Sequence, residues 1–348
     1  MLKIIPDFDL QPCNTLAVPA RARYTAKVRN LEDLQQVLRW YREQQSADES
    51  LPLLVLGGGS NVVLQGDFSG LVLLMKMPGI EQIAEDDNYI WIKAGAGENW
   101  HRLVEHCMQF HCWGIENLAL IPGSVGAAPI QNIGAYGVEL KDIFAELTAV
   151  DIRSGVEVTF QKDACEFSYR DSVFKNRLRD RYIITSVTLK LSKHANCNIS
   201  YPALAGCFSA TELPTPERVF ACVCEMRSSK LPDPVLIPNV GSFFKNPLVT
   251  VDIYRQLLNR YPNMPAFQTD QPQIKLAAGW LIEQAGWKGI ERNGVAVHSA
   301  QALVLTNPGR CSGVAVLALA AEIVTDVQHK FAVELEMEPG IYGEVAAA

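Results

Sequence analysis

Residues 121–138 read IPGSVGAAPIQNIGAYGV, an uncharged stretch in a chain of which 20% is charged. The stretch is long enough to span a membrane, but its four glycines and two prolines would break a helix. Gln131 and Asn132 would also leave polar groups without partners in lipid. We therefore predict a surface built by the main chain, where glycine lets backbone N–H groups and Cα atoms approach a flat polar partner.

The bulk composition is typical of a soluble globular protein. A length of 348 residues favours two domains, at about 150 residues per domain. Hydrophobic residues make up 48% of the chain, and the formal charge is −7 without long blocks of one sign. Because phosphate neutralisation requires a broad basic surface, we do not expect nucleic acid as a partner.

The first ten residues and the cysteines indicate the compartment. MLKIIPDFDL contains two acids and a proline where a signal peptide would carry an unbroken apolar core, so we expect no export signal. Nine cysteines, an odd number without a CxxC pair, favour reduced thiols in a cytoplasmic protein.

The first half of the chain alternates predicted helices and strands. Asn30 precedes apolar positions typical of an amphipathic helix over 31–41, and LLVL at 53–56 is typical of a buried strand. A further helix is expected at 99–110. Four β-rich runs surround it, at 71–75, 89–95, 146–152 and 182–191.

After Tyr201 and Pro202 the sequence pattern becomes helical again. Thr215 is a candidate N-cap with Pro216 at the first helical position. Further helices are expected near 275–285 and 313–329, with strands at 295–298 and 302–306 between them. We predict an α+β chain with an N-terminal domain at 14–195, divided into two α+β subdomains near 70–75, and a smaller α/β domain at 205–348.

Three consecutive glycines, Gly57 to Gly59, follow the strand at 53–56. Their N–H groups can form a concave nest for a phosphate, and Ser60 and Asn61 add side-chain donors. A flexible turn is the alternative. The run is not a dinucleotide-binding GxGxxG, because the third glycine would fall at Val62. Another glycine pair stands in AGAG at 94–97, and three glycine-rich elements together favour a ligand site.

Several motifs, in this order, resemble the UDP-N-acetylenolpyruvoylglucosamine reductase (MurB) family. GGGSNVVL (57–64), AGAG (94–97) and GIENLALIPGSVGAAPIQNIGAYG (114–137) are similar to its flavin-binding domain. The resemblance spans nearly the whole chain, since it continues through SYRDS (168–172), MRSSKLPDP (226–234), GSFFKNP (241–247), KLAAGWLIE (275–283) and QALVLTN (301–307).

The resemblance implies a PCMH/VAO-type FAD-binding domain followed by a smaller substrate-binding domain with a C-terminal catalytic segment. The pyrophosphate would lie on the loop at 57–61 and the flavin against the run at 121–137. The implied cofactor-binding residues are Gly57, Gly58, Gly59, Ser60, Asn61, Ile121, Gly123, Ser124, Gly126, Ile133 and Gly134.

Reduction of an enolpyruvyl ether requires a hydride, a proton and stabilisation of charge developing on the neighbouring carboxylate. Arg170 is a candidate for the charge, because a guanidinium pairs bidentately with a carboxylate. A surface ion pair with Asp171 is the alternative. Ser242 matches the family's proton donor, with help from water or Lys245. Without the family, Gly241 and Ser242 would be only a turn.

The resemblance also implies a catalytic glutamate near the C-terminus. Glu334, Glu336 and Glu338 alternate and would share one strand face, which usually means exposure to solvent. The family's motif places the role at Glu338, with Glu336 as the alternative, because Pro339 and Gly340 stand where relatives continue as a strand. We expect Glu338 to act with Arg170 on the enolate-like intermediate.

Further residues match the family's nucleotide contacts. Tyr201 matches the tyrosine that closes over the nucleotide in one class of the family. As isolated residues the cations would more often be solvated surface charges. The implied substrate-binding residues are Tyr201, Arg227, Lys230, Asn246, Lys275 and Gln301.

Three histidines raise a competing metal hypothesis. His101, His106 and His111 are spaced by five, which rotates each by about 140° along a helix. They would not share a face, so we predict no metal site.

The resemblance implies a ping-pong UDP-N-acetylmuramate dehydrogenase. NADPH would reduce FAD and leave, and the flavin N5 would pass hydride to UDP-N-acetylglucosamine-enolpyruvate, giving UDP-N-acetylmuramate for peptidoglycan synthesis, cell-wall biogenesis, cell shape and cell division. We expect a cytoplasmic monomer that contacts no membrane. The alternatives are another PCMH-fold flavin oxidoreductase, which would oxidise a small hydroxy acid without NADPH, and a non-catalytic, colourless nucleotide-binding module.

Overall fold

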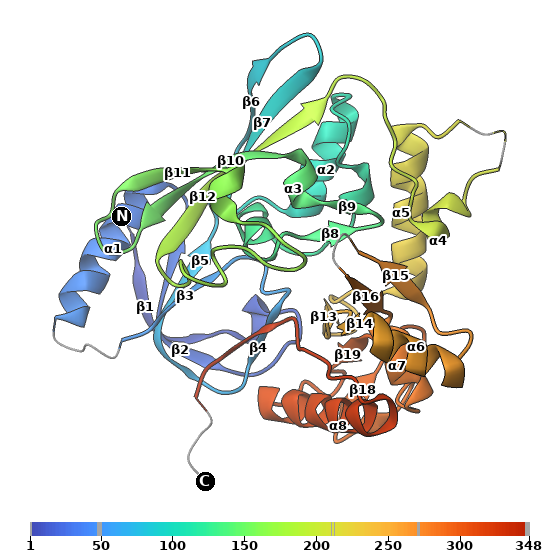
Figure 1. Cartoon of the computed structure of the whole chain (residues 1–348). Coiled ribbons are helices and arrows are strands. Elements are labelled where there is room, and N and C mark those ends of the chain that lie inside the picture. The colour runs from blue at the N-terminus through green and yellow to red at the C-terminus, as the bar shows by residue number, and fades with distance from the viewer. Residues whose placement is uncertain (1, 47–50, 210, 212, 270–271, 345–348) are drawn as a thin grey trace. The chain divides into compact units, whose positions relative to one another are not determined.

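Contacts divide the chain into two compact units that interleave along the sequence (Figure 1). The computed structural model describes residues 2–46, 51–209, 211, 213–269 and 272–344. Unit 1 comprises Met1–Phe8, Ala22–Gly58 and Ser69–Ser229, and unit 2 comprises Asp9–Arg21, Gly59–Phe68 and Lys230–Ala348. This division assigns residues 205–229 to unit 1, and the domain limits 14–195 and 205–348 stay a prediction.

The first sheet of unit 1 has four strands in the order β1-β2-β5-β3, covered by helix α1 (Figure 1). Its strands are β1 (Ile4–Asp9), β2 (Arg21–Val28), β3 (Leu53–Leu56) and β5 (Phe68–Met75). Helix α1 (Leu31–Gln45) begins at Asn30, whose side chain accepts the N–H of Asp33. Its buried face, including Leu34 and Leu38, packs into one core with Leu71 and Leu73 of β5. Helix α1 and strand β3 confirm the helix predicted over 31–41 and the strand predicted at 53–56.

The second sheet of unit 1 has five strands in the order β11-β10-β12-β7-β6, with every neighbouring pair antiparallel. The strands are β6 (Ile80–Glu85), β7 (Tyr89–Gly95), β10 (Phe144–Asp151), β11 (Glu157–Gln161) and β12 (Tyr182–Ser192). Strand β12 is buried on both faces, because Ile183 belongs to the core under α1 and Ile184 to the core on the other side. The sheet is thus the middle layer of unit 1.

Helices and loops cover the face of this middle layer that lies away from α1. The helices are α2 (Trp100–Gln109), α3 (Leu140–Ile143), α4 (Pro202–Ala205) and α5 (Pro216–Lys230). Helix α2 confirms the helix predicted at 99–110, and the Asn99 side chain caps it by accepting the N–H of Arg102. Thr215 Oγ1 accepts the N–H of Arg218 at 3.3 Å at the start of α5, as predicted.

The stretch at 121–138, predicted to be a surface built by the main chain, contains regular secondary structure. A 3₁₀ helix runs over Val125–Gln131 with Pro129 inside it, and a hairpin joins β8 (Gly134–Ala135) to β9 (Val138–Glu139). Asn132 follows the 3₁₀ helix with φ 44° and is fully buried. Its amide donates to Glu139 Oε2 at 2.9 Å and accepts the N–H of Lys141 at 3.0 Å. These hydrogen bonds stabilise Asn132 in a left-handed conformation that glycine adopts more readily.

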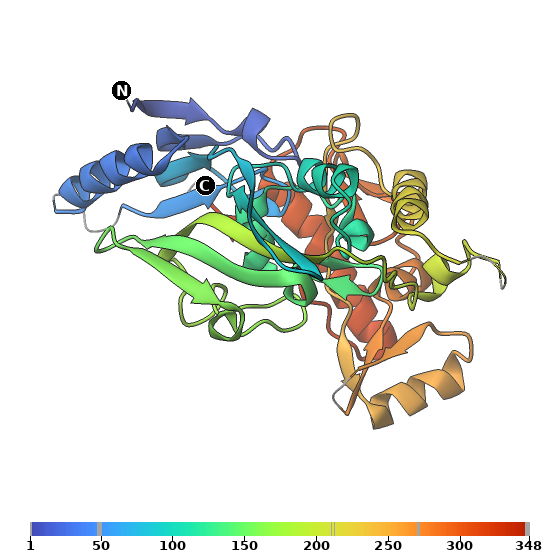
Figure 2. The same cartoon turned by 90° about the horizontal axis from the view of Figure 1, so that it is seen from above.

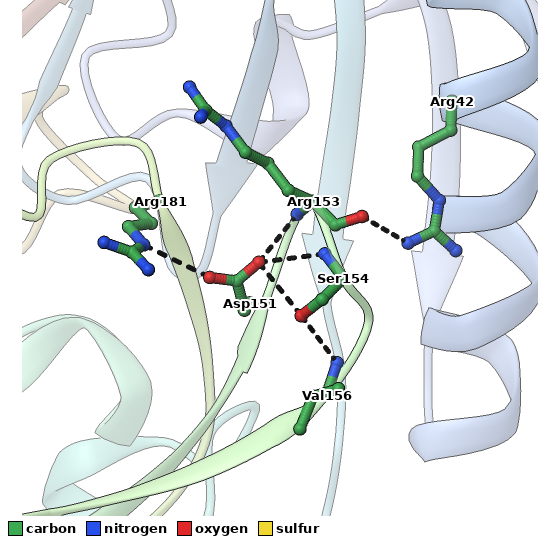
Figure 3. Close-up of polar contacts among 6 residues, drawn as sticks. All are labelled: Arg42, Asp151, Arg153, Ser154, Val156 and Arg181. Atoms are coloured by element: carbon green, nitrogen blue, oxygen red, sulfur yellow. Dashed lines mark hydrogen bonds and ion pairs between the residues drawn. The ribbon is translucent and has the colours of Figure 1, made fainter.

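The turn between β10 and β11 depends on one carboxylate (Figure 3). Asp151 Oδ1 accepts the N–H groups of Arg153 and Ser154 at 3.0 and 2.9 Å, and Arg181 Nε donates to Oδ2 at 3.2 Å. These contacts, first of all the Ser154 N–H, hold the pKa of Asp151 below its usual value. Arg42 of α1 donates to the Arg153 carbonyl at 2.9 Å, which ties the turn to the helix.

Unit 2 contains a four-stranded sheet in the order β13-β19-β18-β17, a three-stranded sheet in the order β14-β16-β15, and the parallel pair β20-β4. Helix α8 contacts α7, β18 and β4, and α6 packs on β14 and β16 (Figure 2, orange). The elements are β4 (Val62–Leu64), β13 (Asn239–Ser242), β14 (Leu248–Thr250), α6 (Val251–Arg260), β15 (Ala266–Gln268), β16 (Gln273–Leu276), α7 (Ala278–Gln284), β17 (Glu291–Arg292), β18 (Val295–Val297), β19 (Val304–Thr306), α8 (Gly313–Phe331) and β20 (Gly340–Tyr342).

Two expectations for unit 2 are wrong in part. The helix predicted near 275–285 begins only at Ala278, because Lys275 pairs with Leu248 in the three-stranded sheet. The glutamates at 334–338 lie in extended chain rather than in a strand, with one isolated bridge from Met337 to Phe244. The chain does form a strand beyond Pro339, because β20 pairs with β4.

Among the helices that the structure describes, none is both long enough and apolar enough to cross a membrane.

Gly97 tests the packing of unit 1. A Cβ at this position would lie 2.4 Å from the carbonyl carbon of Lys76 and 2.4 Å from the nitrogen of Met77, both backbone atoms. We expect Gly97→Ala to destabilise the protein by roughly 2–4 kcal/mol, because backbone cannot move as a side chain can. The midpoint of thermal unfolding checks this.

Gly206→Ala is the matched control, since its Cβ would meet nothing closer than 3.6 Å and its φ is −64°. Equal midpoints for the two variants would contradict the packing argument.

Candidate functional site

The glycine loop after β3 lies directly against the uncharged stretch within unit 1. A Cβ on Gly57 would lie 2.0 Å from Ser124 Oγ, and a Cβ on Gly58 would lie 3.0 Å from the Cα of Gly123. Gly126 is as crowded, because its Cβ would lie 2.5 Å from the Cβ of Ala96. These glycines therefore let three chain segments meet. The sequence pattern suggested that these glycines leave room for a ligand. The structure shows that they also leave room for the loops to contact one another.

A pocket of about 100 Å³ opens beside these loops within unit 1. Gly57, Ser124 and Gly126 line one side with backbone and small side chains. The other lining residues are Val55, Met75, Ala96, Ala127, Ile130, Tyr182, Ile183 and Ile184. The wall is mostly apolar, with a small polar edge at Ser124.

Two isoleucines predicted to contact the cofactor differ in exposure. Ile121 is half-buried, whereas Ile133 is only 8% exposed and belongs to the hydrophobic core. The Ile133 carbonyl accepts the N–H of Leu140 at 2.8 Å, and its N–H donates to the Ala128 carbonyl. Ile133 therefore stabilises the stretch at 121–138 through core packing and backbone hydrogen bonds.

The rest of the glycine loop belongs to unit 2. Gly59 has φ +64°, and a Cβ there would lie 2.0 Å from the carbonyl oxygen of Cys13. Its carbonyl accepts the N–H of Thr15 at 3.0 Å. The carbonyl of Asn61 accepts the N–H of Gly340 at 3.0 Å, and Asn61 Nδ2 lies 3.5 Å from the Glu338 carbonyl oxygen. The loop thus meets the C-terminal segment.

Arg170 lies beside the β8-β9 hairpin of unit 1. It has φ +55°, a conformation that non-glycine residues adopt rarely. Its guanidinium donates to the Gly134 carbonyl at 2.9 Å and lies 5.8 Å from the centre of the Tyr169 ring. The Asp171 carboxylate accepts a hydrogen bond from Asn176 at 3.0 Å.

A second arginine lies close enough to Arg170 for their charges to interact. Burial lowers the pKa of Arg227, the neighbouring Tyr136 opposes this, and the charge of Arg170 lowers the pKa further. Arg227 Nε is buried and has no hydrogen-bond partner among the residues that the structure describes. An anion bound here would relieve both the repulsion and the lost hydration, so the pair has the properties of an anion site.

Tyr201 lies at the first position before α4 and contacts the same hairpin. Its ring meets the Tyr136 ring edge to face, with centroids 5.4 Å apart and planes at 85°. Burial raises the pKa of Tyr136, while Arg227 lowers it. Unit 1 therefore brings together three predicted residues, Arg170, Arg227 and Tyr201, around one hairpin.

Unit 2 brings together Ser242 and Glu338. The N–H of Glu338 donates to the carbonyl of Phe243 at 2.9 Å, and the N–H of Lys245 donates to the carbonyl of Glu336 at 2.9 Å. Ser242 is exposed at the end of β13, one residue before Phe243. Lys245 Nζ forms an ion pair with the Glu336 carboxylate. Glu338 is half-buried, whereas Glu336 is exposed, so the two candidate acids occupy different surroundings.

The other predicted substrate residues also lie in unit 2, and two of them have structural contacts. Asn246 Oδ1 accepts the N–H of Ala278 at 2.9 Å and so caps α7. Gln301 Oε1 accepts the N–H of Leu303 at 3.3 Å. Lys275 Nζ lies 5.9 Å from the centre of the Phe267 ring, and Lys230 is exposed at the end of α5.

The histidines are engaged separately. His101 Nδ1 accepts the N–H of Leu120 at 3.1 Å, and the His106 and His111 rings contact Phe110 and Trp113. Within the described part of the chain, no three His, Cys, Asp or Glu side chains are grouped so that they could hold a metal ion.

Sequence reasoning did not identify Tyr136, Asn117 or the pocket residues on β12. Tyr136 stands inside the quoted stretch, and its ring could have been noticed there. Asn117 donates to the carbonyls of Tyr136 and Asn198, 19 and 81 residues away, a pairing without a local sequence signal.

Comparisons with known proteins place these features in a family context. A model described as "UDP-N-acetylenolpyruvoylglucosamine reductase, C-terminal domain" matches residues 233–342, and one described as "FAD binding domain" matches residues 22–161. UDP-N-acetylenolpyruvoylglucosamine reductase from Pseudomonas syringae pv. tomato is 46% identical over 96% of this chain and 97% of its own length. The protein of the same name from Shewanella oneidensis is 45% identical over 97% and 96%.

Solved structures agree on the fold. UDP-N-acetylenolpyruvylglucosamine reductase (MurB) from Thermus caldophilus has a TM-score of 0.64 and 22% identity, covering 98% of this chain and 99% of that one. A solvent-stable cholesterol oxidase has a TM-score of 0.50 at 13% identity, covering 97% and 87%. The predicted fold class and family resemblance are therefore confirmed.

Gly57 tests the loop contact as a cofactor cradle. We expect Gly57→Ala to displace Ser124 and to weaken FAD retention by about tenfold or more, the equivalent of about 1.4 kcal/mol. The flavin absorbance of the purified protein, titrated with FAD, measures this.

The double variant Gly57→Ala/Ser124→Gly removes the clash, because Ala127 Cβ at 4.0 Å is then the nearest of the three atoms next to the new Cβ. It should recover the FAD affinity of Ser124→Gly alone. Normal FAD retention by the single variant Gly57→Ala would contradict the cradle.

Proposed function

The chain belongs to the UDP-N-acetylenolpyruvoylglucosamine reductase family, and we propose that it reduces UDP-N-acetylglucosamine-enolpyruvate to UDP-N-acetylmuramate, with FAD as cofactor and NADPH as reductant. The near-full-length identity to reductases of that name carries the proposal. The balance is one hydride from NADPH and one proton, added across the enolpyruvyl double bond.

The residues around the pocket of unit 1 fit FAD. Gly57 and Gly58 keep side chains away from the place where the two loops meet, and the pocket wall is apolar enough for a flat ring. Bound FAD would supply hydride transfer from NADPH to the enolpyruvyl carbon. We propose the cofactor contacts at the eleven positions named from the sequence, with Ile133 acting through its loop.

We propose that Arg170 and Arg227 hold anionic oxygens of the substrate. Their repulsion and the lowered pKa of Arg227 favour an anionic ligand, and a guanidinium can pair bidentately with a carboxylate. Arg170 would stabilise the charge that develops on the carboxylate as hydride arrives.

We propose that Ser242 donates the proton and that Glu338 acts as the catalytic carboxylate. The pairing of Phe243 with Glu338 supports this, because it holds both residues on adjacent backbone of unit 2. The ion pair of Glu336 with Lys245 favours Glu338 over Glu336. Lys245 is thereby engaged with a carboxylate, so water is the better helper for Ser242.

We propose nucleotide contacts for the remaining predicted residues. Tyr201 would cover the nucleotide, and cations suit its diphosphate. Asn246 accepts the N–H of Ala278 and Gln301 accepts the N–H of Leu303 through the amide oxygen, so their amide N–H groups would donate to the substrate. The contacts proposed are Tyr201, Arg227, Lys230, Asn246, Lys275 and Gln301.

The reaction suggests the cellular role. We propose that the protein acts in the cytoplasm as a monomer, in peptidoglycan synthesis, and thereby in cell-wall biogenesis, cell shape and cell division. Family membership supports this role.

Turnover with the purified protein tests the proposal. NADPH oxidation should depend on UDP-N-acetylglucosamine-enolpyruvate, and the sugar product should gain two hydrogen atoms by mass spectrometry. Flavin reduction by a small hydroxy acid, without any reaction with NADPH, would instead favour an oxidase on the same fold.

The two candidate acids give a matched pair of variants. We expect Glu338→Gln to lower kcat by roughly 100- to 10,000-fold, the range for loss of a positioned acid or base, while FAD stays bound. Glu336→Gln loses only an ion pair at an exposed carboxylate and should change kcat by less than about fivefold. Steady-state kinetics on both variants decides, and the opposite ranking would transfer the role to Glu336.

A further inference from the structure

The turn of the β8-β9 hairpin contacts several other segments of unit 1 through Tyr136 and Gly137. Tyr136 has φ +49° and Gly137 has φ +87°, so both central residues of this two-residue turn are left-handed. A tyrosine is disfavoured in that conformation, so the turn requires support from its surroundings. Side chains of two asparagines supply that support.

Asn117 holds the first carbonyl of the turn. It is 1% exposed, and its Nδ2 donates to the carbonyl of Tyr136 and to the carbonyl of Asn198, both at 2.8 Å. A side-chain amide has two donor hydrogens, and both are used here on separate segments. Its Oδ1 is buried without a hydrogen-bond partner in the described part of the chain. Asn117 therefore acts at this position as a double hydrogen-bond donor that joins the carbonyls of Tyr136 and Asn198.

Asn198 holds the second carbonyl and the chain that leads to Tyr201. Its Nδ2 donates to the carbonyl of Gly137 at 3.1 Å, and its Oδ1 accepts from the N–H and Oγ of Ser200 at 3.0 and 2.7 Å. Gly137 has φ +87°, which favours glycine, and a Cβ there would make a tight contact of 3.0 Å with Ser200 Oγ. The Asn198 amide thus links the hairpin to the residue before Tyr201.

These links converge on the residues proposed to bind substrate. The Tyr136 ring contacts the Tyr201 ring, and Tyr136 lies within electrostatic range of Arg227. Arg170 donates to the carbonyl of Gly134 at the start of the same hairpin. Any shift of the turn would therefore change the placement of Tyr201 relative to both arginines.

We propose that Asn117 and Asn198 are positioning residues that hold Tyr201 in its substrate-binding place by joining the start of its segment to the Tyr136-Gly137 turn. They act through Tyr201 and touch no reacting atom. The inference rests on the proposed function, in which Tyr201 covers the nucleotide.

The first test is Asn198→Asp, an isosteric change at an exposed residue. It keeps the acceptor for Ser200 but removes the donor to Gly137, and it sets a carboxylate against that carbonyl. We expect KM for UDP-N-acetylglucosamine-enolpyruvate to rise about 5- to 20-fold, the range for one or two lost hydrogen-bond contributions. The kcat, the FAD content and the thermal midpoint should change little.

A double-variant cycle separates positioning from a general structural effect. In the Tyr201→Ala background, Asn198→Asp should have almost no further effect on KM, because the residue that it positions is absent. Additive effects on KM, or a fall in kcat and thermal midpoint without a change in KM, would overturn the proposal.

Asn88→Asp is the control, because Asn88 is exposed in the turn between β6 and β7 of the same unit. It should leave KM unchanged. A wild-type protein that fails to turn over the enolpyruvyl substrate would reject the proposed function. Normal wild-type turnover with an unchanged KM in Asn198→Asp would reject only the positioning role.

Discussion

The structure of unit 1 depends on one close approach between two loops without side chains in the way. Gly57 and Gly58 meet Gly123 and Ser124 at distances that leave no space for a Cβ on Gly57 and almost none on Gly58. This contact brings the end of a buried strand next to a 3₁₀ helix, and the apolar pocket opens beside it. Gly57, Ser124 and Gly126 line one side of that pocket, so the main chain is accessible to a ligand on this side. The glycines are thus required for the contact between the loops.

The residues proposed for chemistry lie on or beside short, locally paired backbone segments. In unit 2, backbone hydrogen bonds place Glu338 beside Phe243 and Glu336 beside Lys245. In unit 1, the hairpin turn at Tyr136 and Gly137 fixes the neighbours of Arg227 and Tyr201. In both units a short, locally paired segment sets the position of reactive side chains, a form of preorganisation that costs no rearrangement on binding.

Local signals in the sequence predicted the parts that local chemistry decides. Asn30 and Thr215 cap the helices for which the sequence pattern named them as caps. Long-range pairing decided the parts that were missed. Lys275 lies in a strand because Leu248 pairs with it, and the glutamate segment is held by one bridge at Met337. The glycine-rich motifs resemble a flavin-binding domain, and the match of residues 22–161 to an FAD-binding domain confirms that domain type. No sequence pattern showed that Ser124 would fill the space beside Gly57 or that Asn117 would join two distant carbonyls.

The visible spectrum of the purified protein under anaerobic conditions tests the central claim most directly. We expect a yellow protein whose colour bleaches with NADPH and returns on addition of UDP-N-acetylglucosamine-enolpyruvate, which would establish cofactor, reductant and acceptor together. A colourless protein that takes up no added FAD would contradict the reading of the glycine loops as a flavin cradle. A flavin that bleaches and never recovers with the enolpyruvyl sugar would contradict the substrate.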